Sequence, residues 1–212
     1  MIIDKYTLVV FDLDGTLVHT KAEYRYLLVP KVLKHLGKNP RIDLRLIDKF
    51  WFDGNRNTTI QNDFGCDPMI FWRTIHKVDD MKERDKYTYV YNDVHEAIYM
   101  LAKIGKVLAI TTGAAKKLAN FEADLLPREL FTTITPIRSS HYKDKPHPGS
   151  LLGCLKLCKA NLNEAVYIGN SSEDCEYSAN AGVDFIYLDR YEHDFKGGSV
   201  STIHTLLELF LK

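Results

Sequence analysis

Two aspartates at the end of a short apolar run are the first residues whose types and spacing suit chemistry. Leu8–Phe11 is a run of four large apolar residues, and Asp12 and Asp14 follow it just before Gly15. Such a run predicts a buried strand of a parallel sheet. Side chains two positions apart on an extended chain share one side, so both carboxylates can face one crevice, where ligands bind in open α/β sheets. An Asp-Gly pair alone is equally typical of a hairpin turn.

Two further segments carry groups that bind an anion. A second apolar run ends in Thr111, Thr112 and Gly113, just before a predicted helix. Free backbone N–H groups at a helix start, with a hydroxyl beside them, form an anion site. A threonine at this place is also a common helix cap. Lys145 precedes a proline that stiffens the backbone and can hold the ammonium in place, although most loop lysines are simply solvated.

A fourth segment, residues 167–174, combines a strand end, a glycine turn and a helix start with Asn170 and Asp174. Asp174 and Asp12 supply two hard oxygen ligands, which suits Mg²⁺ held together with a substrate phosphate and water. The alternative is that these residues only cap the following helix. Because all four segments lie at strand ends of one predicted sheet, together they supply what phosphoryl transfer needs.

The order of the predicted elements indicates an α/β core with an inserted helical domain. From about residue 18 to residue 84 the apolar spacing is helical without strand alternation, and Leu44–Phe52 is one of its predicted helices. From Val94–Lys103 onward, helices alternate with strands, which predicts a Rossmann-like parallel sheet with helices on both faces. Residues 1–17 and 88–212 are predicted to form the core and 18–87 the helical domain. The last helix is predicted at 202–211.

Composition excludes several classes of partner. Among the 212 residues, Lys+Arg and Asp+Glu both number 28, so nothing favours nucleic acid or an acidic membrane surface. No apolar run approaches the roughly 18 residues that span a bilayer, and the first residues lack a signal-peptide layout, so we expect a cytoplasmic monomer or homodimer. The four cysteines predict free thiols, although Cys154 and Cys158 could form half a metal site.

On its four motifs, in order, the chain is identified as a member of the haloacid dehalogenase superfamily, phosphatase branch. The resemblance spans essentially the whole chain, and the helical insertion resembles the four-helix cap of phosphoglycolate phosphatase and β-phosphoglucomutase relatives. It implies that Asp12 is the nucleophile and Asp14 the general acid and base. It further implies phosphate binding by Thr111, Thr112, Gly113 and Lys145, and Mg²⁺ binding by Asp12, Asp14, Asn170 and Asp174.

One residue departs from the pattern that the resemblance implies. Asn170 stands where an acid is usual. An amide still offers an oxygen but no charge, so we expect weaker Mg²⁺ binding, with Glu173 as a possible compensating acid. Arg56, in the polar stretch 54–58 between two predicted helices, could bind a second anionic group of the substrate, or it could be an ordinary solvated residue.

The expected function is a Mg²⁺-dependent phosphatase that acts on a small phosphorylated metabolite, similar to phosphoglycolate or a sugar phosphate. One alternative is a phosphomutase that uses the same aspartyl-phosphate intermediate. The other is a non-catalytic binding or regulatory protein on a phosphatase fold, suggested by Asn170. Dehalogenation is disfavoured, because the dehalogenases of the family lack the second acid that Asp14 provides.

Overall fold

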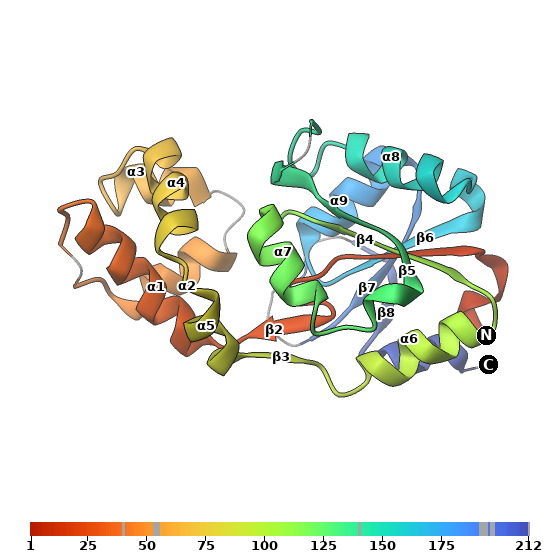
Figure 1. Cartoon of the computed structure of the whole chain (residues 1–212). Helices are drawn as coiled ribbons and strands as arrows, with labels where there is room; N and C mark the ends of the chain where they lie inside the picture. The colour runs from red at the N-terminus through yellow and green to blue at the C-terminus, as the bar shows by residue number, and fades with distance from the viewer. Residues whose placement is uncertain (40, 53–55, 140, 191–194, 196–197, 212) are drawn as a thin grey trace. The chain divides into compact units, whose positions relative to one another are not determined.

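The computed structural model describes residues 1–39, 41–52, 56–139, 141–190, 195 and 198–211. The chain divides into two compact units (Figure 1). One unit consists of residues 1–19 together with 89–212, and the other of residues 20–88. The second unit is therefore inserted into the first, close to the segment that the helical spacing predicts.

The larger unit is built on a six-stranded sheet in which all paired strands are parallel. The strand order is β5-β4-β1-β6-β7-β8. On one side of the sheet the chain passes from β1 to β4 and then to β5, each farther from the centre. On the other side it passes from β6 to β7 and then to β8, again away from the centre. The crevice between β1 and β6 is therefore the topological switch point, where ligands bind in such sheets. The strands are β1 (Leu8–Phe11), β4 (Val107–Thr112), β5 (Phe131–Pro136), β6 (Ala165–Gly169), β7 (Asp184–Leu188) and β8 (Ser201–Ile203).

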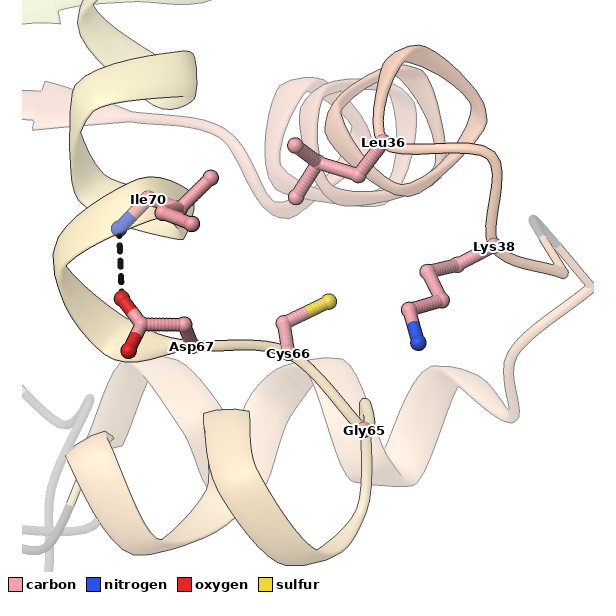
Figure 2. A pocket seen from close by; sticks show the side chains of 6 residues that line it. All are labelled: Leu36, Lys38, Gly65, Cys66, Asp67 and Ile70. Carbon is pink, nitrogen blue, oxygen red and sulfur yellow. Dashed lines mark hydrogen bonds between the residues drawn. The ribbon is translucent and has the colours of Figure 1, made fainter.

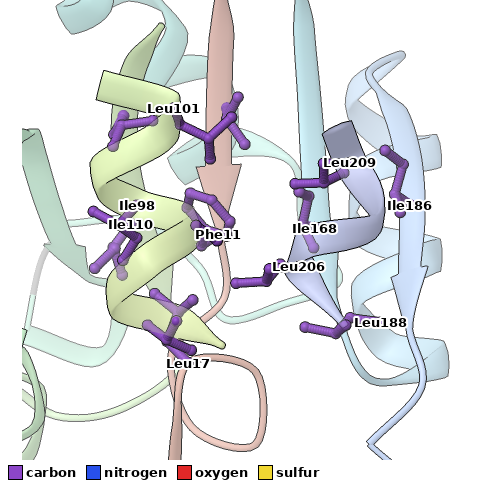
Figure 3. Packing of buried hydrophobic residues seen from close by; sticks show 14 of the residues in the cluster. Phe11, Leu17, Ile98, Leu101, Ile110, Ile168, Ile186, Leu188, Leu206 and Leu209 are labelled. Atoms are coloured by element: carbon purple, nitrogen blue, oxygen red, sulfur yellow. The ribbon is translucent and has the colours of Figure 1, made fainter. Parts of the chain in front are cut away.

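Side chains of the central strand alternate between two hydrophobic cores. Val9 and Phe11 lie in one cluster, and Leu8 and Val10 lie in the other, because successive residues of a strand point to opposite faces. The first cluster includes residues of α6 and η6 (Figure 3), and the second includes residues of α8 and α9. The α-helices in the described part of this unit are α6 (Val94–Lys103), α7 (Lys116–Ala123), α8 (Gly149–Cys158) and α9 (Ser172–Ala181), and the 3₁₀ helix η6 (Leu206–Phe210) follows β8.

The inserted unit is helical and has its own core. Phe50, Phe64 and Phe71 are buried there, and the ring centroid of Phe50 lies 5.5 Å from that of each of the other two. Aromatic rings at this separation add to the stabilisation from burial itself. The elements of this unit are α1 (Ala22–His35), α2 (Leu44–Phe52), α3 (Arg56–Asn62), α4 (Pro68–Val78), α5 (Met81–Arg84) and the 3₁₀ helix η2 (Asp85–Tyr87).

The helical unit also contains a buried, fully engaged ion pair. Arg84 donates to both carboxylate oxygens of Asp79, from Nε at 3.1 Å and from Nη2 at 2.8 Å. The Tyr24 hydroxyl donates to the same carboxylate at 2.6 Å, and Arg84 Nη1 donates to Thr20 Oγ1 at 3.2 Å. This network connects α1, which carries Tyr24, with α5, which carries Arg84.

The predicted fold class is confirmed, and two predicted elements are wrong. Residues 202–211 do not form one helix, because Ile203 pairs with Leu188 of β7 and so belongs to strand β8, and the 3₁₀ helix η6 follows. The segment after Leu17 is not helical from its start, because β2 (Val18–Thr20) pairs with β3 (Thr88–Val90) in a two-stranded sheet. Strands this short carry too few residues for a periodic pattern.

Two simpler properties follow from the described residues. No helix in the described ranges is both long and apolar enough to cross a bilayer. None of Cys66, Cys154, Cys158 and Cys175 forms a disulfide bond within the described residues, as the sequence predicts.

Candidate active site

The carboxyl ends of β1 and β6 bring Asp12 and Asn170 to the switch point of the sheet. Asp12 directly follows β1, and its backbone N–H donates to Ile168 O of β6 at 2.9 Å. Asn170 directly follows β6, which ends at Gly169. Both side chains are buried, with residue exposures of 7% for Asp12 and 4% for Asn170. A carboxylate and an amide are therefore held in a place from which most water is excluded.

Lys145 joins two of the candidate acids through one ammonium group. Its Nζ donates to Asp12 Oδ1 at 2.6 Å and to Asp174 Oδ1 at 2.7 Å. It also donates to the Tyr167 hydroxyl at 2.7 Å, so all three N–H bonds are used. The Lys145 side chain is only 4% exposed. Lys145 lies 133 positions from Asp12 and 29 from Asp174 in the sequence, so three distant segments meet at a single buried point.

Asp174 has partners at both carboxylate oxygens. Oδ1 accepts from Lys145 and from the Tyr167 hydroxyl, the latter at 3.2 Å. Oδ2 accepts from Ser171 Oγ at 2.6 Å, and the Asp174 N–H donates back to that Oγ at 3.1 Å. This is a capping box at the start of α9. Asp174 therefore takes part in the helix cap and also contacts the Lys145 ammonium. A capping role and a place in the candidate site are compatible for this residue.

The two glycines at the strand ends are required by close packing. A Cβ at Gly169 would lie 2.6 Å from Asp174 Cγ, and a Cβ at Gly15 would lie 2.4 Å from Asn170 Nδ2. Gly15 also has a φ of +82°, a conformation that side-chain-bearing residues rarely adopt. The turn after Asp14 can therefore approach Asn170 only because residue 15 lacks a side chain.

Thr16, in the same turn, connects Asn170 to Asp12. Its Oγ1 lies 3.2 Å from Asn170 Oδ1 and 3.4 Å from Asp12 Oδ2. The Asn170 Nδ2 atom is buried, and no described neighbour forms a hydrogen bond with it. A buried amide donor without a partner is costly and indicates that a group from outside the chain, such as a ligand oxygen or water, completes this site.

The predicted anion segment lies at the end of β4. Thr111 is fully buried, and its hydroxyl interacts with the hydroxyl of Tyr177. Thr112 Oγ1 accepts from the Ala114 N–H at 3.2 Å within the turn before α7, and it does not cap that helix, whose N-cap residue is Ala115. A Cβ at Gly113 would meet nothing within 4 Å, so the space beside this turn is open. Thr111 and Gly113 together leave a hydroxyl and a free volume for an incoming anion.

Burial and charge shift the pKa values of the central pair. Loss of water around Asp12 raises the pKa of its carboxyl to about 7, with Lys145 opposing the rise and Asp174 and Asp14 adding to it. Burial lowers the pKa of the Lys145 ammonium, but Asp12 and Asp174 outweigh that effect and hold its pKa well above the usual range. Lys145 therefore stays positively charged while two or more carboxylates compete for it.

The donor set fits Mg²⁺ bound together with a phosphate and does not fit a metal held by the chain alone. Asp12, Asp14 and Asp174 bring more negative charge to the site than Lys145 compensates, which favours a cation. No cluster of three or more His, Cys, Asp or Glu side chains with metal-site geometry occurs within the described ranges. Mg²⁺ commonly uses only one or two carboxylates and completes its shell with substrate phosphate and water.

Sequence reasoning missed Tyr167. This tyrosine is completely buried in β6, and its hydroxyl contacts both Lys145 and Asp174. The available signal was one phenol within an otherwise aliphatic strand, because a buried tyrosine hydroxyl needs a polar partner. Thr16 was missed for the opposite reason, since a threonine in a turn has no distinctive pattern.

Arg56 is the first residue of α3 in the helical unit, and its Nε is buried without a hydrogen-bond partner in the described ranges. Gly54 and Asn55, which belong to the same predicted polar stretch, lie outside the described residues. A substrate contact by Arg56 therefore stays a prediction.

A pocket of about 200 Å³ lies elsewhere in the helical unit (Figure 2). It is lined by Leu36, Lys38, Gly65, Cys66, Asp67 and Ile70. Within it, Asp67 Oδ1 accepts from the Ile70 N–H at 2.9 Å and so caps α4. None of the residues with predicted catalytic or phosphate-binding roles lines this pocket.

A parallel α/β sheet with buried acids and an ammonium at its switch point defines a class of enzymes that act on ligands at strand ends. Residues 9–188 match the model of the haloacid dehalogenase-like hydrolase family, and the chain belongs to this family. It is an enzyme of the hydrolase class. The membership inferred from the four motifs is therefore confirmed.

Individual relatives agree with this assignment. A protein of Caldanaerobacter subterraneus, provisionally described as the pyrophosphatase PpaX, is 29% identical over 179 residues, which cover 84% of this chain and 80% of that protein. A Lactobacillus plantarum structure, provisionally described as a phosphoglycolate phosphatase, has a TM-score of 0.79 at 22% identity and covers 97% of this chain and 99% of its own. The β-phosphoglucomutase of Clostridium difficile has a TM-score of 0.73 at 17% identity, with coverage of 97% and 94%.

Proposed function

We propose that the protein is a Mg²⁺-dependent phosphatase that hydrolyses a small phosphorylated metabolite through an aspartyl-phosphate at Asp12. The observation that carries this proposal is the contact of Lys145 Nζ with Asp12 Oδ1 at 2.6 Å in a buried site. An ammonium beside a nucleophilic carboxylate offsets the charge that a phosphate dianion would otherwise meet there. The names of the relatives, which include a pyrophosphatase and a phosphoglycolate phosphatase, support a phosphorylated substrate.

In the proposed reaction, an Asp12 carboxylate oxygen attacks phosphorus in line with the departing oxygen, and the substrate P–O bond breaks. Asp14 gives its proton to the departing alkoxide and then takes a proton from the water that hydrolyses the aspartyl-phosphate. Thr111 Oγ1 and the N–H groups near Gly113 orient the transferred phosphoryl group. Lys145 holds the phosphate oxygens beside Asp12.

Asp12, the turn at Asp14 and Asn170 would hold Mg²⁺ in this proposal. The metal would supply positive charge to the phosphate oxygens, as it does in phosphoryl-transfer sites generally. Asp174 is the least available of the four predicted ligands, because each of its two oxygens accepts from two protein donors. We therefore assign Asp174 first to the positioning of Lys145.

We further propose that residues 18–87 act as a cap that selects the substrate, since the sheet domain would bind only the phosphate group. Arg56 is our candidate for a contact to a second anionic group. Substrates with a carboxylate or a second phosphate near the transferred group, as in phosphoglycolate, fit an arginine that is not engaged through its Nε.

The experiment is phosphate release from p-nitrophenyl phosphate and from a panel of phosphorylated metabolites over a Mg²⁺ series. Asp12→Asn should lower turnover by a factor on the order of 10³ or more, because the nucleophile is lost. Asp4→Asn is the matched control, since Asp4 is an exposed acid near the N-terminus. Turnover that survives Asp12→Asn, or no turnover by the parent protein at any Mg²⁺ concentration, would refute the proposal.

A phosphomutase is the second candidate, because β-phosphoglucomutase shares the fold. It would form the same aspartyl-phosphate but return the phosphoryl group to its substrate. Isomerisation that depends on a sugar bisphosphate and releases no net phosphate would identify it.

A further inference from the structure

Arg190, just after β7, reaches the turn that carries Asp14. Its guanidinium donates to the Thr16 carbonyl oxygen from Nη2 at 3.0 Å and from Nε at 3.3 Å. Its side chain is only 7% exposed, and its centre lies 4.0 Å from the ring centroid of Tyr91. Two donors on one backbone carbonyl and an aromatic face fix both the plane and the direction of the guanidinium.

The other side of the guanidinium is fixed by Asp93. Arg190 Nη1 donates to both oxygens of this carboxylate, at 3.0 Å and 3.1 Å. Asp93 Oδ2 also accepts from the Leu206 N–H at 2.6 Å, so the acid is tied to the start of η6 and lies directly before α6. Arg190 therefore connects the turn after β1 to parts of the sheet domain that carry no predicted catalytic residue.

Stability alone is a poor explanation for this arrangement. A buried, fully hydrogen-bonded ion pair is often no more stabilising than apolar residues of the same volume. The third partner of Arg190 is a backbone carbonyl of the turn, whose conformation is already unusual, with a φ of +82° at Gly15. Within the described residues, no hydrogen bond to the Asp14 carboxylate is found, so the direction of Asp14 depends on the backbone of this turn.

We propose that Arg190 is a positioning residue that, through the Thr16 carbonyl, fixes the turn so that Asp14 is aimed at the departing oxygen. The hydroxyl of Thr16, in the same turn, lies beside Asp12 and Asn170. By fixing this turn, Arg190 therefore positions the Thr16 hydroxyl as well as Asp14. This inference rests on the proposed function, because it requires that Asp14 protonate the leaving group.

The test compares turnover of substituted phenyl phosphates whose phenols differ in pKa. Proton donation matters little for p-nitrophenolate and more for unsubstituted phenolate, which is the poorer leaving group. We expect Arg190→Met to lower kcat/KM, which includes only the steps up to departure of the leaving group, about tenfold more for phenyl phosphate than for p-nitrophenyl phosphate, in the direction set by Asp14→Asn. Arg190→Lys should recover part of the difference, because an ammonium can satisfy the carbonyl or Asp93 but lacks the planar fork.

Arg128→Met is the matched control, since Arg128 is a half-exposed arginine paired with Asp124 far from these contacts in the sequence. A loss of kcat/KM by Arg190→Met that is equal for all leaving groups, or an unchanged kcat/KM, would overturn the inference. If Arg190→Met does not fold, the same comparison is made with Arg190→Lys and Asp93→Asn. The inference would be overturned if neither variant lowers turnover more for phenyl phosphate than for p-nitrophenyl phosphate.

The two proposals fail in different ways. If Asp14→Asn leaves the leaving-group dependence unchanged, or the parent protein turns over none of these esters, the proposed function fails and the inference with it. If Asp14→Asn steepens the dependence while the Arg190 variants do not, only the role of Arg190 is wrong.

Discussion

Removal of the ammonium at Lys145 tests the charge balance of the site most directly. In the structure, Lys145 lies between Asp12 and Asp174, with Nζ–O distances of 2.6 Å and 2.7 Å and side-chain exposures of 10% or less for all three groups. The change Lys145→Met keeps most of the side-chain volume and deletes only the charge and its hydrogen bonds. Two buried carboxylates are then left without a cation.

The expected loss is large. Breaking a buried ion pair by removal of one partner costs about 3–5 kcal/mol. For a chain of this size each kcal/mol lowers Tm by about 2–4 °C, so we expect Lys145→Met to lower Tm by about 6–20 °C in the absence of Mg²⁺. The difference in Tm between the parent protein and Lys145→Met should be smaller at pH 5 than at pH 8. Without Lys145 the pKa of the Asp12 carboxyl, which burial already raises, rises further, and a group with a raised folded pKa destabilises the protein as pH rises through that value.

The assay is thermal unfolding of four proteins together with phosphate release. Lys145→Met combined with Asp174→Asn should recover at least about half of the lost Tm, because one of the two uncompensated charges is gone. Its turnover should stay low, since the phosphate would still lack the ammonium. Lys31→Met is the control, because Lys31 forms an exposed ion pair that contributes little. A Tm of Lys145→Met within about 1 °C of the parent, or no recovery in the double variant, would refute the reasoning.

Two further predictions concern the metal and pH. Asn170→Asp should lower the Mg²⁺ concentration for half-maximal turnover about tenfold, equivalent to about 1.4 kcal/mol, and should increase the rise in Tm that Mg²⁺ produces. An unchanged or higher requirement would contradict a metal role for residue 170. Asp184 accepts from Lys5 Nζ at 2.8 Å and from the Tyr6 hydroxyl at 2.7 Å, and these bonds lower the pKa of its carboxyl. A lowered folded pKa stabilises the protein above the unfolded value of about 3.9, and this stabilisation is lost as pH falls through the folded value. Asp184→Asn should therefore lower Tm by about 1–2 °C at pH 7, after allowance for screening at this half-exposed site, and by nothing measurable near pH 2; an equal loss at both pH values would contradict it.

Much of the fold could be predicted because its signals are local. The helices α2 and α6 begin and end at the predicted residues, Leu44–Phe52 and Val94–Lys103. The run Leu8–Phe11 is a central strand because four consecutive apolar residues can be buried only where both faces of a sheet are covered. Local signals failed at 202–211, where pairing with β7 decided the structure of Ile203.

The sequence by itself determined which groups are available at the strand ends: two acids after β1, a hydroxyl after β4, a lysine before α8, and an amide and an acid after β6. It also limited the carboxylate count through Asn170, because residue type alone sets the charge. These facts need no coordinates, since they depend on residue type and on the rule that parallel strands end at one edge.

Only the tertiary structure decided how these groups are paired. Three sets of contacts join distant segments. Lys145 donates to both Asp12 and Asp174, and Tyr167 completes the contacts of the ammonium. Arg190 donates to the Thr16 carbonyl oxygen. No local pattern encodes them, because the partner of a buried charge is fixed by strand order and by which side chains the folded core brings within a few ångströms. The free energy of a charge depends on those neighbours far more than on its own residue type.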